Sequence, residues 1–565
     1  MIEIYKKLPG HQKFISVMLI IIIFFSPLLS SWRVEYRGGI IIFFSLLLLI
    51  ILSVINFNRT KKIELHKLIF SCFILTLLIS MLFSSEKELS LVWTAYYVGW
   101  FAVFWAAQST RFARKLFLFI FTLSLFLVLL YCWWQYYEIF PATIKYFQQH
   151  PELTGIFSNT VLKPRLYGSF QYPNALASFI ILSTGIILTS LLSEKNCKLN
   201  WSLLLHSPVN WWLIILFGGC SFFIWLTASR AGIIIWMVQV TIIVLLFLKT
   251  HLKLSAILLT LAVICSSWSL LSTDRANENY SAETITTRTI EISKTSASKL
   301  LTFKGSVNMI KHHPWFGVGA GLFGHNYYRY RPQSQTDAPN SAHNLFLDIT
   351  AQTGIFSGML LFILLFLILK SCLNNKIIII VLCSVLLHSM VDWNFNIIGI
   401  GFSFFILAGL YCMPKYISVP KPAFFVLTGV KIISILLAAL GLYFLARSTI
   451  GGFLFMSAHQ NHKFQNWQIA RKQYHQAIKV NPLRAEYYLH FSFVQTDLHR
   501  AEDNLLRAKD LAPFWYEPYY HLARINYLQN NNAAALLFSD SALQLFPSSG
   551  EVRALTDSIH SNISK

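Results

Sequence analysis

The feature that most constrains this chain is a series of apolar runs, each about long enough to cross a bilayer as a helix. Lipid offers no hydrogen-bond partners to the backbone, so runs of this length are expected to fold as helices. The chain is therefore predicted to be all-α, a polytopic helical membrane protein with about 12–13 transmembrane helices, a large outward loop and a C-terminal helical-repeat domain. The runs lie at about 14–31, 38–57, 68–84, 89–108, 116–137, 173–193, 211–228, 231–248, 254–271, 356–372, 377–391, 396–413 and 423–446.

Basic residues in alternate connections predict the orientation of these helices. The connections concerned carry Arg59, Lys61, Lys62, Lys67, Arg111, Arg114, Lys115, Lys195, Lys198, Lys249, Lys253, Lys370, Lys376, Lys415 and Lys421. They are assigned to the cytoplasmic side together with the N-terminus, so the long loops 138–172 and 271–355 face outward. Lys431 lies inside the last run, and if that run does not cross, the C-terminal region moves to the cytoplasm.

The formal net charge of +22 fits basic cytoplasmic loops and also allows a site for anionic groups. No nucleic-acid-binding motif accompanies it, so nucleic acid is not expected as a partner. We predict four parts. They are N-terminal transmembrane helices at 1–137, a second membrane domain at 138–413 with outward loop 272–355, a last transmembrane helix and linker at 414–460, and helical repeats at 461–565.

The C-terminal part contains a repeat in which an alanine precedes a proline by five residues. The three copies are Ala477 with Pro482, Ala508 with Pro513, and Ala542 with Pro547. The pattern resembles tetratricopeptide repeats, in which a small alanine lets helices pack closely and the proline ends the second helix of a pair. Two or three such units are few for independent stability, so they are expected to pack against the membrane domain. Such repeats usually bind a partner segment; the alternative is a structural cap.

One stretch, 341–358, closes the long outward loop and runs into a new apolar segment. If Ser341 or Asn340 caps the helix that follows, His343 lies in its first turn, near unpaired backbone N–H groups. The positive end of the helix dipole then favours a neutral imidazole, the form that a general base needs. The same N–H groups could hold an anion. The alternative is a histidine beside a helix cap with no chemical task.

Two arginines are predicted at the outer membrane surface. Arg165 precedes the span that begins near Pro173, and Arg230 lies in a connection with almost no loop. A guanidinium fixed there is costly unless it meets an anion or hydrogen-bond acceptors. The alternative is that these side chains reach out to lipid headgroups.

The large outward loop carries three further patterns. Residues 298–310 have amphipathic helical spacing, and a glycine-rich run follows. The glycines follow no strand, so they do not indicate a nucleotide site. His312, His313 and His325 lack paired carboxylates at suitable spacing, and no metal site or other cofactor is predicted. Farther along, Asp392 lies four residues after His388, which suggests a structural hydrogen bond on one helix face.

Together these segments resemble the O-antigen ligase and O-antigen polymerase superfamily over roughly residues 150–410. The resemblance rests on Arg165, Gly168, Phe170, Pro173 and Asn174, on the turn from Ser229 to Gly232, on His313, Gly317 and Gly319, and on His343 and Asn344 nine residues before Gly354. It implies a bacterial cytoplasmic membrane protein whose active face and C-terminal repeats lie outside the cytoplasm.

The implied activity is metal-independent, inverting transfer or polymerisation of a glycan from a polyprenyl-diphosphate carrier onto an acceptor hydroxyl. In this interpretation Arg165, Arg230 and either Lys299 or Arg288 bind the diphosphate, and His343 is the base. Asn174, Asn344, Gly317, Gly319 and Gly354 support them. Membrane lipids surround the protein, and a protein partner of the repeats is possible.

Two positions depart from the family pattern. Lys299 stands where an arginine is usual and Arg288 is the nearest arginine, so either can complete the diphosphate clamp. Ser357 stands where the ligases have glycine, threonine or tyrosine, which favours a polymerase or a protein O-oligosaccharyltransferase over a ligase proper. The acceptor is left open between a glycan, a lipid-anchored sugar, a wall polymer and a protein.

Two alternatives belong to other classes. A glycan transporter or flippase usually places ionisable residues near the middle of the bilayer, and here Lys431 is the only Lys, Arg, Asp or Glu in the interior of a predicted span. An envelope-assembly scaffold would act through the repeats.

Overall fold

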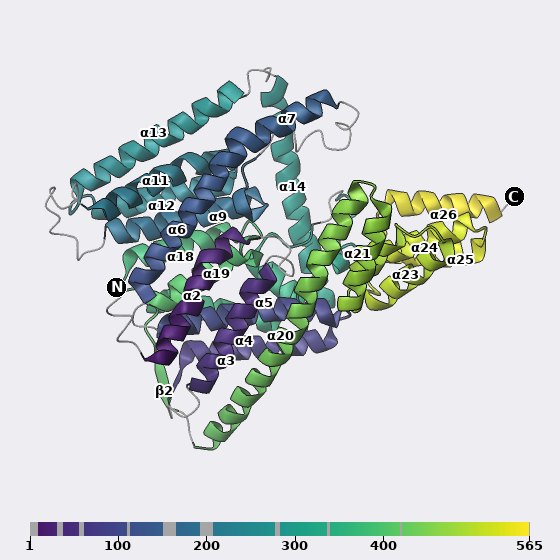
Figure 1. The fold of residues 1–565 in the computed structure, drawn as a ribbon, viewed down its shortest axis with the longest axis horizontal. Helices are drawn as coiled ribbons and strands as arrows, with labels where there is room; N and C mark the ends of the chain where they lie inside the picture. The colour runs from purple at the N-terminus through teal and green to yellow at the C-terminus, as the bar shows by residue number, and fades with distance from the viewer. Residues whose placement is uncertain are drawn as a thin grey trace. The chain divides into compact units, whose positions relative to one another are not determined.

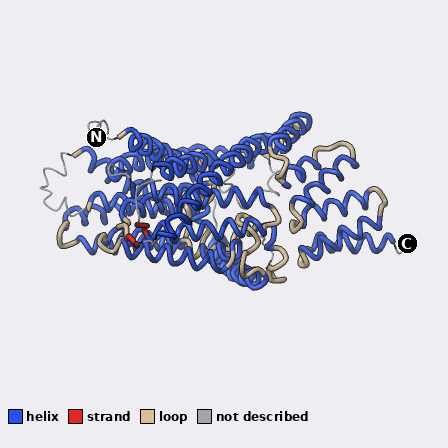
Figure 2. The backbone as a smooth tube through the Cα atoms, turned by 90° about the horizontal axis from the view of Figure 1, so that it is seen from below, coloured by secondary structure: helices blue, strands red, loops and turns tan. Residues whose placement is uncertain are grey.

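The computed structural model describes residues 9–30, 38–55, 62–109, 113–150, 165–192, 207–276, 283–335, 339–418 and 421–563. Within them the chain is almost wholly helical, and only two short antiparallel strands, β1 (Lys62–Glu64) and β2 (Tyr416–Ser418), pair with each other (Figure 2). The prediction of an all-helical, polytopic membrane protein is confirmed. The described residues contain nine helices that are long and apolar enough to span a membrane, and four shorter apolar helices.

The apolar helices follow the predicted runs in chain order (Figure 1). They are α2 (Gly10–Leu28), α3 (Gly39–Ile55), α4 (Leu65–Phe83), α5 (Lys87–Ser109), α6 (Ala113–Trp134), α9 (Pro173–Leu191), α11 (Pro208–Leu226), α12 (Arg230–Phe247), α13 (Leu252–Ala276), α17 (Ile355–Ser371), α18 (Lys376–His388), α19 (Ile398–Tyr411) and α20 (Lys421–Lys463). The spans predicted near 38–57, 356–372, 377–391 and 396–413 correspond to the four shorter apolar helices.

Two boundaries differ from the sequence-based expectation. The helix that carries the fifth predicted span does not stop near residue 137: α6 continues through the π-helical turn η2 (Gln135–Ile139) into α7 (Phe140–Gln149). The helix that carries the last predicted span does not stop near residue 446: α20 continues to Lys463 through the stretch expected to be a linker. Apolar periodicity marks where a helix enters lipid, whereas polar residues can continue the same helix into water.

The contacts divide the chain into two compact units. Unit 1 comprises residues 1–66, 99–287 and 365–424, and unit 2 comprises residues 67–98, 288–364 and 425–565. In unit 1, α9 packs against α11, α12, α18 and α19. Nearly every side chain of α9 is buried, which makes it the central helix of this packing. The 3₁₀ turn η4 (Gly168–Phe170) lies immediately before α9 and packs against it.

Unit 2 contains the outward loop and the C-terminal helices. The loop carries α14 (Glu283–His312), which belongs to this unit from Arg288 onward, and the short helices α15 (Phe323–Tyr327) and α16 (Leu345–Thr353). The predicted amphipathic helix at 298–310 is thus confirmed as part of α14. Thr302, Ser306 and Met309 are buried on one face of it, and Lys304 is exposed.

The C-terminal helices pack as consecutive antiparallel neighbours. They are α21 (Trp467–Val480), α22 (Ala485–Ser492), α23 (Leu498–Leu511), α24 (Tyr516–Leu528), α25 (Asn532–Leu545) and α26 (Gly550–Ile563). The repeated alanines Ala477, Ala508 and Ala542 are fully buried. Each repeated proline follows the end of α21, α23 or α25 by two residues, as expected for a proline that cannot continue a helix. The tetratricopeptide assignment itself stays a prediction.

Candidate functional site

Arg165 is held in unit 1 by acceptors from two segments. Its Nε donates to the carbonyl oxygen of Thr227 at 3.0 Å, and one terminal nitrogen donates to Asn174 Oδ1 at 2.8 Å and to the carbonyl oxygen of Ala228 at 3.3 Å. Asn174 is the second residue of α9, after Pro173 at the first turn, where a proline suits helix initiation. The predicted association of Arg165 with Asn174 is therefore a direct hydrogen bond.

Arg230 is the first residue of α12. A turn of three residues, Thr227 to Ser229, separates it from the end of α11 at Leu226. Ala228 has a positive φ of 49°, which closes this short turn. Gly232 allows close helix packing, since an added Cβ would lie 2.7 Å from the Cβ of Ala177 in α9. The Arg230 side chain is exposed, and no described residue forms a hydrogen bond or ion pair with its guanidinium.

Arg165 and Arg230 interact electrostatically. Desolvation lowers the pKa of the Arg165 guanidinium from its ordinary value, and the positive charge of Arg230 lowers it further. Tyr172 and Asp392 act in the opposite direction on the same pKa. Two guanidinium groups near each other at a helix N-terminus form a setting that an anion would stabilise.

Asp392 joins two residues at the start of α9, Tyr172 just before the helix and Asn174 in its first turn. It accepts a hydrogen bond from the Tyr172 hydroxyl at 2.8 Å, and the Asn174 amide also donates to it. Burial, together with the charge of Asp392, raises the pKa of Tyr172 well above its ordinary value, so the phenol keeps its proton and donates. Asp392 is 3% exposed, so its charge is largely removed from water and held by these donors.

The predicted sharing of one helix face by His388 and Asp392 is wrong. Helix α18 ends at His388, and Asp392 lies beyond it in an irregular turn. The His388 ring is fully buried, with Nδ1 2.6 Å from Ser178 Oγ and Nε2 3.4 Å from Ser229 Oγ. Ser229 immediately precedes Arg230, so the buried ring holds the α11–α12 turn against α9.

His343 belongs to unit 2, and its predicted position in the first helical turn is wrong. The cap of α16 is Asn344, whose side chain accepts from the N–H groups of Phe346 and Leu347, both at 3.0 Å. His343 therefore lies one residue before the cap, with a left-handed φ of 50°. Because Asn344 already occupies two of the N–H groups at this helix start, the predicted anion site at the same groups is weakened.

The backbone around His343 is fixed by Asp348 and Gln352, two residues that the sequence did not single out. Asp348 Oδ1 accepts from the Ala342 N–H at 2.8 Å, and its other oxygen accepts from the Gln352 amide at 2.7 Å. Gln352 in turn accepts from the Gly321 N–H. Asp348 and Gln352 are 2% and 3% exposed. Their spacing of four in an otherwise apolar helix is the one signal that could have identified them.

The supporting glycines form a tight backbone contact with the end of α16. The N–H groups of Val318 and Gly319 donate to the carbonyl oxygens of Ala351 and Gln352, at 3.2 and 2.7 Å. Gly317, Gly319 and Gly354 all have positive φ, at 64°, 112° and 90°. A Cβ at Gly317 would lie 2.2 Å from the Gln352 carbonyl carbon, so glycine is required by space as well as by conformation.

The remaining predicted residues also lie in unit 2. Lys299 is partly exposed in α14, and Arg288 lies in the same helix, although its side chain is outside what the structure describes. His312 contacts the carbonyl oxygen of Asn308 through Nδ1, and His313 Nε2 lies 2.7 Å from the Tyr330 hydroxyl. Among the described residues there is no group of three metal-ligating side chains. Desolvation and nearby Arg329 lower the pKa of His313, which favours its neutral form.

The predicted residues thus form two groups, one in each unit. Arg165, Asn174 and Arg230 associate in unit 1, while His343 and Asn344 associate with the three supporting glycines in unit 2.

The fold defines the class first: a multi-pass helical membrane protein. Residues 213–363 match the family model described as O-antigen ligase, over about a quarter of the chain. The match begins in α11, ends in α17, and includes Arg230, Lys299 and His343. No curated protein matches the chain. At the level of the family, the match supports a glycosyltransferase-like membrane enzyme that ligates or polymerises glycans, with a lipid-linked donor and an acceptor.

Proposed function

We propose that this protein transfers or polymerises a glycan from a polyprenyl-diphosphate carrier onto an acceptor hydroxyl at the outer face of the bacterial cytoplasmic membrane. The observation that carries the proposal is the exposed Arg230 guanidinium at the start of α12, close enough to Arg165 to lower its pKa. Arg165 already has three acceptors, whereas no described residue pairs with Arg230, so Arg230 is available to an anionic ligand.

In the proposed reaction, Arg230 and Arg165 bind the donor diphosphate, with Lys299 or Arg288 as a further cation. As the bond between the anomeric carbon and the phosphate oxygen breaks, negative charge grows on the leaving diphosphate, and the guanidinium groups stabilise it. The polyprenyl diphosphate leaves with the bonding electron pair. Asp392 and Asn174 contribute by holding Arg165 in one orientation.

His343 is proposed as the base. Its imidazole takes the proton from the acceptor hydroxyl while the hydroxyl oxygen attacks the anomeric carbon opposite the leaving group, which inverts the configuration there. The fixed backbone at Ala342 and Asn344 supports this role, because a base must be held within hydrogen-bond reach of its proton. No step of this scheme draws on a metal ion.

The acceptor is left open between a glycan, a lipid-anchored sugar, a wall polymer and a protein. Transfer onto a protein hydroxyl is the second candidate function, and its chemistry is the same. Ser357 favours it over a ligase proper. In the structure its Oγ lies 2.8 Å from Thr76 Oγ1 and 2.9 Å from the Thr353 carbonyl oxygen, both in unit 2, and its one proton can be donated to either.

Arg230 offers the sharpest test of donor recognition. We expect Arg230→Ala to reduce turnover of a polyprenyl-diphosphate oligosaccharide by roughly 10²–10³-fold, because a charge-stabilising donor is lost. Arg230→Lys should recover only part of the rate, since lysine keeps the charge without the bidentate fork. Lipid release and donor binding would be measured with purified protein in detergent.

Arg447→Ala is the matched control, because Arg447 bonds the Val480 carbonyl at 2.8 Å in unit 2, far along the chain from the proposed diphosphate site. Full turnover in folded Arg230→Ala would reject the assignment. Donor binding without release by the wild-type protein, for every acceptor class offered, would instead favour a transporter or scaffold.

A further inference from the structure

Three turns of the C-terminal helices occupy the same place in successive helix pairs. They follow α21, α23 and α25, and contain Pro482, Pro513 and Pro547 respectively. Equivalent positions in stacked helix pairs line one edge of the array. In this protein all three turns contact membrane-domain segments of unit 2, at the beginning of α5 and along residues 323–335.

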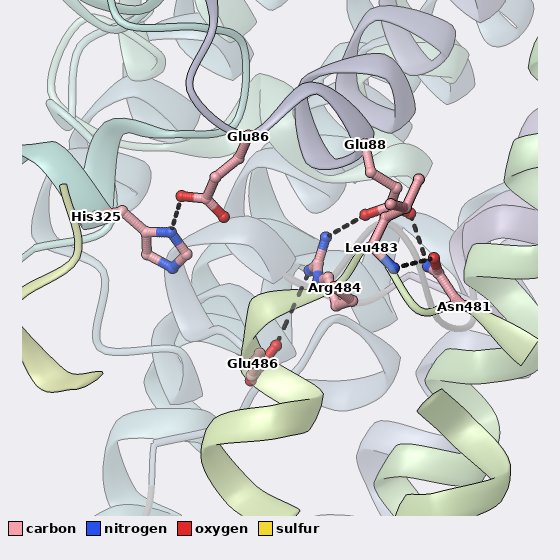
Figure 3. A network of polar contacts seen from close by, with 7 residues as sticks. All are labelled: Glu86, Glu88, His325, Asn481, Leu483, Arg484 and Glu486. Carbon is pink, nitrogen blue, oxygen red and sulfur yellow. Dashed lines mark hydrogen bonds and ion pairs between the residues drawn. The ribbon is translucent and has the colours of Figure 1, made fainter. Parts of the chain in front are cut away.

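The first turn is anchored by a buried carboxylate (Figure 3). Asn481 Nδ2 donates to Glu88 Oε1 at 2.9 Å, and Arg484 forms an ion pair with the other oxygen of Glu88 at 3.4 Å. The Arg484 and Glu88 side chains are 6% and 3% exposed. Loss of Arg484 would leave the buried Glu88 carboxylate with only the Asn481 amide, so this contact favours the docked arrangement.

The second turn stacks on the loop. The Trp515 ring lies parallel to the His325 ring, with centroids 4.7 Å apart and an interplanar angle of 6°. His325 Nδ1 is 2.6 Å from Glu86 Oε1, so the same ring is held from two sides (Figure 3). The neighbouring Phe514 ring lies beneath the Arg329 guanidinium, 5.4 Å from its centroid.

The third turn contacts Tyr328 and Arg331 of the loop. Arg331 Nε donates to Ser548 Oγ at 2.8 Å, and the same guanidinium lies 4.3 Å from the centroid of the Phe546 ring. Tyr328 packs between Tyr516 and Phe546, with centroids 4.8 and 4.7 Å away. The second and third proline turns therefore contact His325, Tyr328, Arg329 and Arg331.

Segment 323–335 connects directly to the stretch that carries His343. Helix α15, at the start of this segment, packs against α16. Gly324 lies so close to Asn340 that an added Cβ would be 2.5 Å from its Oδ1. Just before the segment, the Gly321 N–H donates to Gln352, which bonds Asp348, and Asp348 holds the Ala342 N–H beside His343.

We propose that the C-terminal repeats position the outward loop for catalysis: the first proline turn anchors the repeats to the start of α5, and the second and third turns hold segment 323–335 and, through it, the backbone on which His343 is presented. Trp515, Arg484 and Arg331 are positioning residues in this scheme. The inference rests on the proposed function for its catalytic consequence, but the docking itself is a separate, measurable property. The edge of the repeats formed by these turns is occupied by the protein's own loop, so a partner segment would bind elsewhere on them.

The test uses the full-length protein with Trp515→Ala, Trp515→Phe and the control Trp467→Ala, which removes an exposed tryptophan of α21. Hydrogen–deuterium exchange reports on residues 321–353, and steady-state kinetics give kcat and KM for the lipid-linked donor. We expect Trp515→Ala to speed exchange in this region at least about 3-fold, the scale of one lost aromatic pair. It should lower kcat while KM for the donor stays the same. Trp515→Phe should restore both, and Trp467→Ala should change neither.

Arg331→Ala, with the exposed Arg500→Ala as control, serves as an independent pair if Trp515→Ala does not fold. Unchanged exchange in residues 321–353 for a folded Trp515→Ala or Arg331→Ala variant would overturn the positioning role. Faster exchange with kcat unchanged would also overturn it. Faster exchange in a protein whose wild type transfers no glycan would reject the proposed function and retain the docking, so the two failures are distinguishable.

Discussion

At the scale of single residues, the most informative feature is the conformation of His343. A residue other than glycine in the left-handed region costs about 1–2 kcal/mol, and it persists where the surroundings fix it. Here the His343 N–H donates to Ser341 Oγ at 3.3 Å, Asp348 holds Ala342, and Asn344 caps the next helix. Strain of this kind clusters at functional sites, which fits the role proposed for the imidazole.

The start of a helix close to His343 could be predicted from the sequence, but the capping residue and the conformation of His343 could not. Ser341, Asn340 and Asn344 are all suitable caps, and apolar spacing does not decide among them. The choice depends on the contact between the Ala342 N–H and Asp348, which the sequence pattern did not indicate.

His325 makes the docking of the repeats dependent on pH. Burial lowers the pKa of the imidazole, but pairing with Glu86 outweighs burial, so the net pKa lies above 6.5. The stabilisation is therefore fully present below about pH 6.5 and is lost as pH rises through the raised value. The charged groups that face His325 are Glu86, Arg484, Glu486 and Glu517.

We therefore expect the difference in thermal unfolding temperature between wild type and His325→Gln to shrink from pH 6 to pH 9. His521→Gln is the matched control. Burial lowers the pKa of His521 to about 4, so this ring stays neutral across the range and its difference should be constant. If the difference in unfolding temperature between wild type and His325→Gln did not change with pH, as expected for His521→Gln, the ion pair between His325 and Glu86 would be contradicted.

At the scale of elements, the glycine run and α16 act as one unit. The sequence indicated that glycines here permit close approach, and the structure shows which backbone they approach. A Cβ at Gly354 would lie 2.0 Å from the carbonyl oxygen of Trp315, a backbone atom that cannot rotate away. The Ile355 N–H also donates to the Pro314 carbonyl at 2.8 Å, which closes the contact from the other side.

Gly354→Ala is therefore expected to destabilise the fold by more than the about 1–2 kcal/mol of a left-handed backbone alone, because steric overlap is added. The thermal unfolding midpoint should fall, and transfer should fall with it as α16 shifts. Gly550→Ala is the control, since a Cβ there meets nothing within 4 Å. A Gly354→Ala variant as stable and active as Gly550→Ala would show that this contact does not fix α16.

The elements were predictable to different degrees. Long apolar runs located the membrane helices, and the alanine–proline repeat located the ends of α21, α23 and α25, because both depend on local chemistry. The continuation of α6 into α7 was not predicted, because the apolar run ends among polar residues such as Glu138 and Pro141 follows. The structure accommodates both within one continuous helix through the π-helical turn at Gln135–Ile139. The buried residues His388 and Asp392 contact residues of α9 that are more than 200 positions earlier in the chain. Hydrophobic periodicity does not reveal such long-range contacts.

At the scale of the whole molecule, the four parts predicted along the chain do not coincide with the two compact units. Each unit is built from three separate stretches, and unit 2 joins the repeats, the outward loop and residues 67–98. The sequence suggested that the repeats need support. Glu86 and Glu88 supply part of that support; Glu86 precedes α5 and Glu88 lies in its first turn, between the predicted spans 68–84 and 89–108.

The central claim is that a polyprenyl-diphosphate-linked glycan is the donor and His343 the base. The most direct measurement is release of polyprenyl diphosphate from a purified lipid-linked oligosaccharide by the detergent-solubilised protein, with EDTA present and products resolved by mass. We predict release by the wild type, a reduction of about 10²–10⁴-fold in folded His343→Ala, and a product mass that identifies the acceptor. Equal release by both proteins would reject His343 as the base, and no release by either, with the donor bound, would contradict transfer itself.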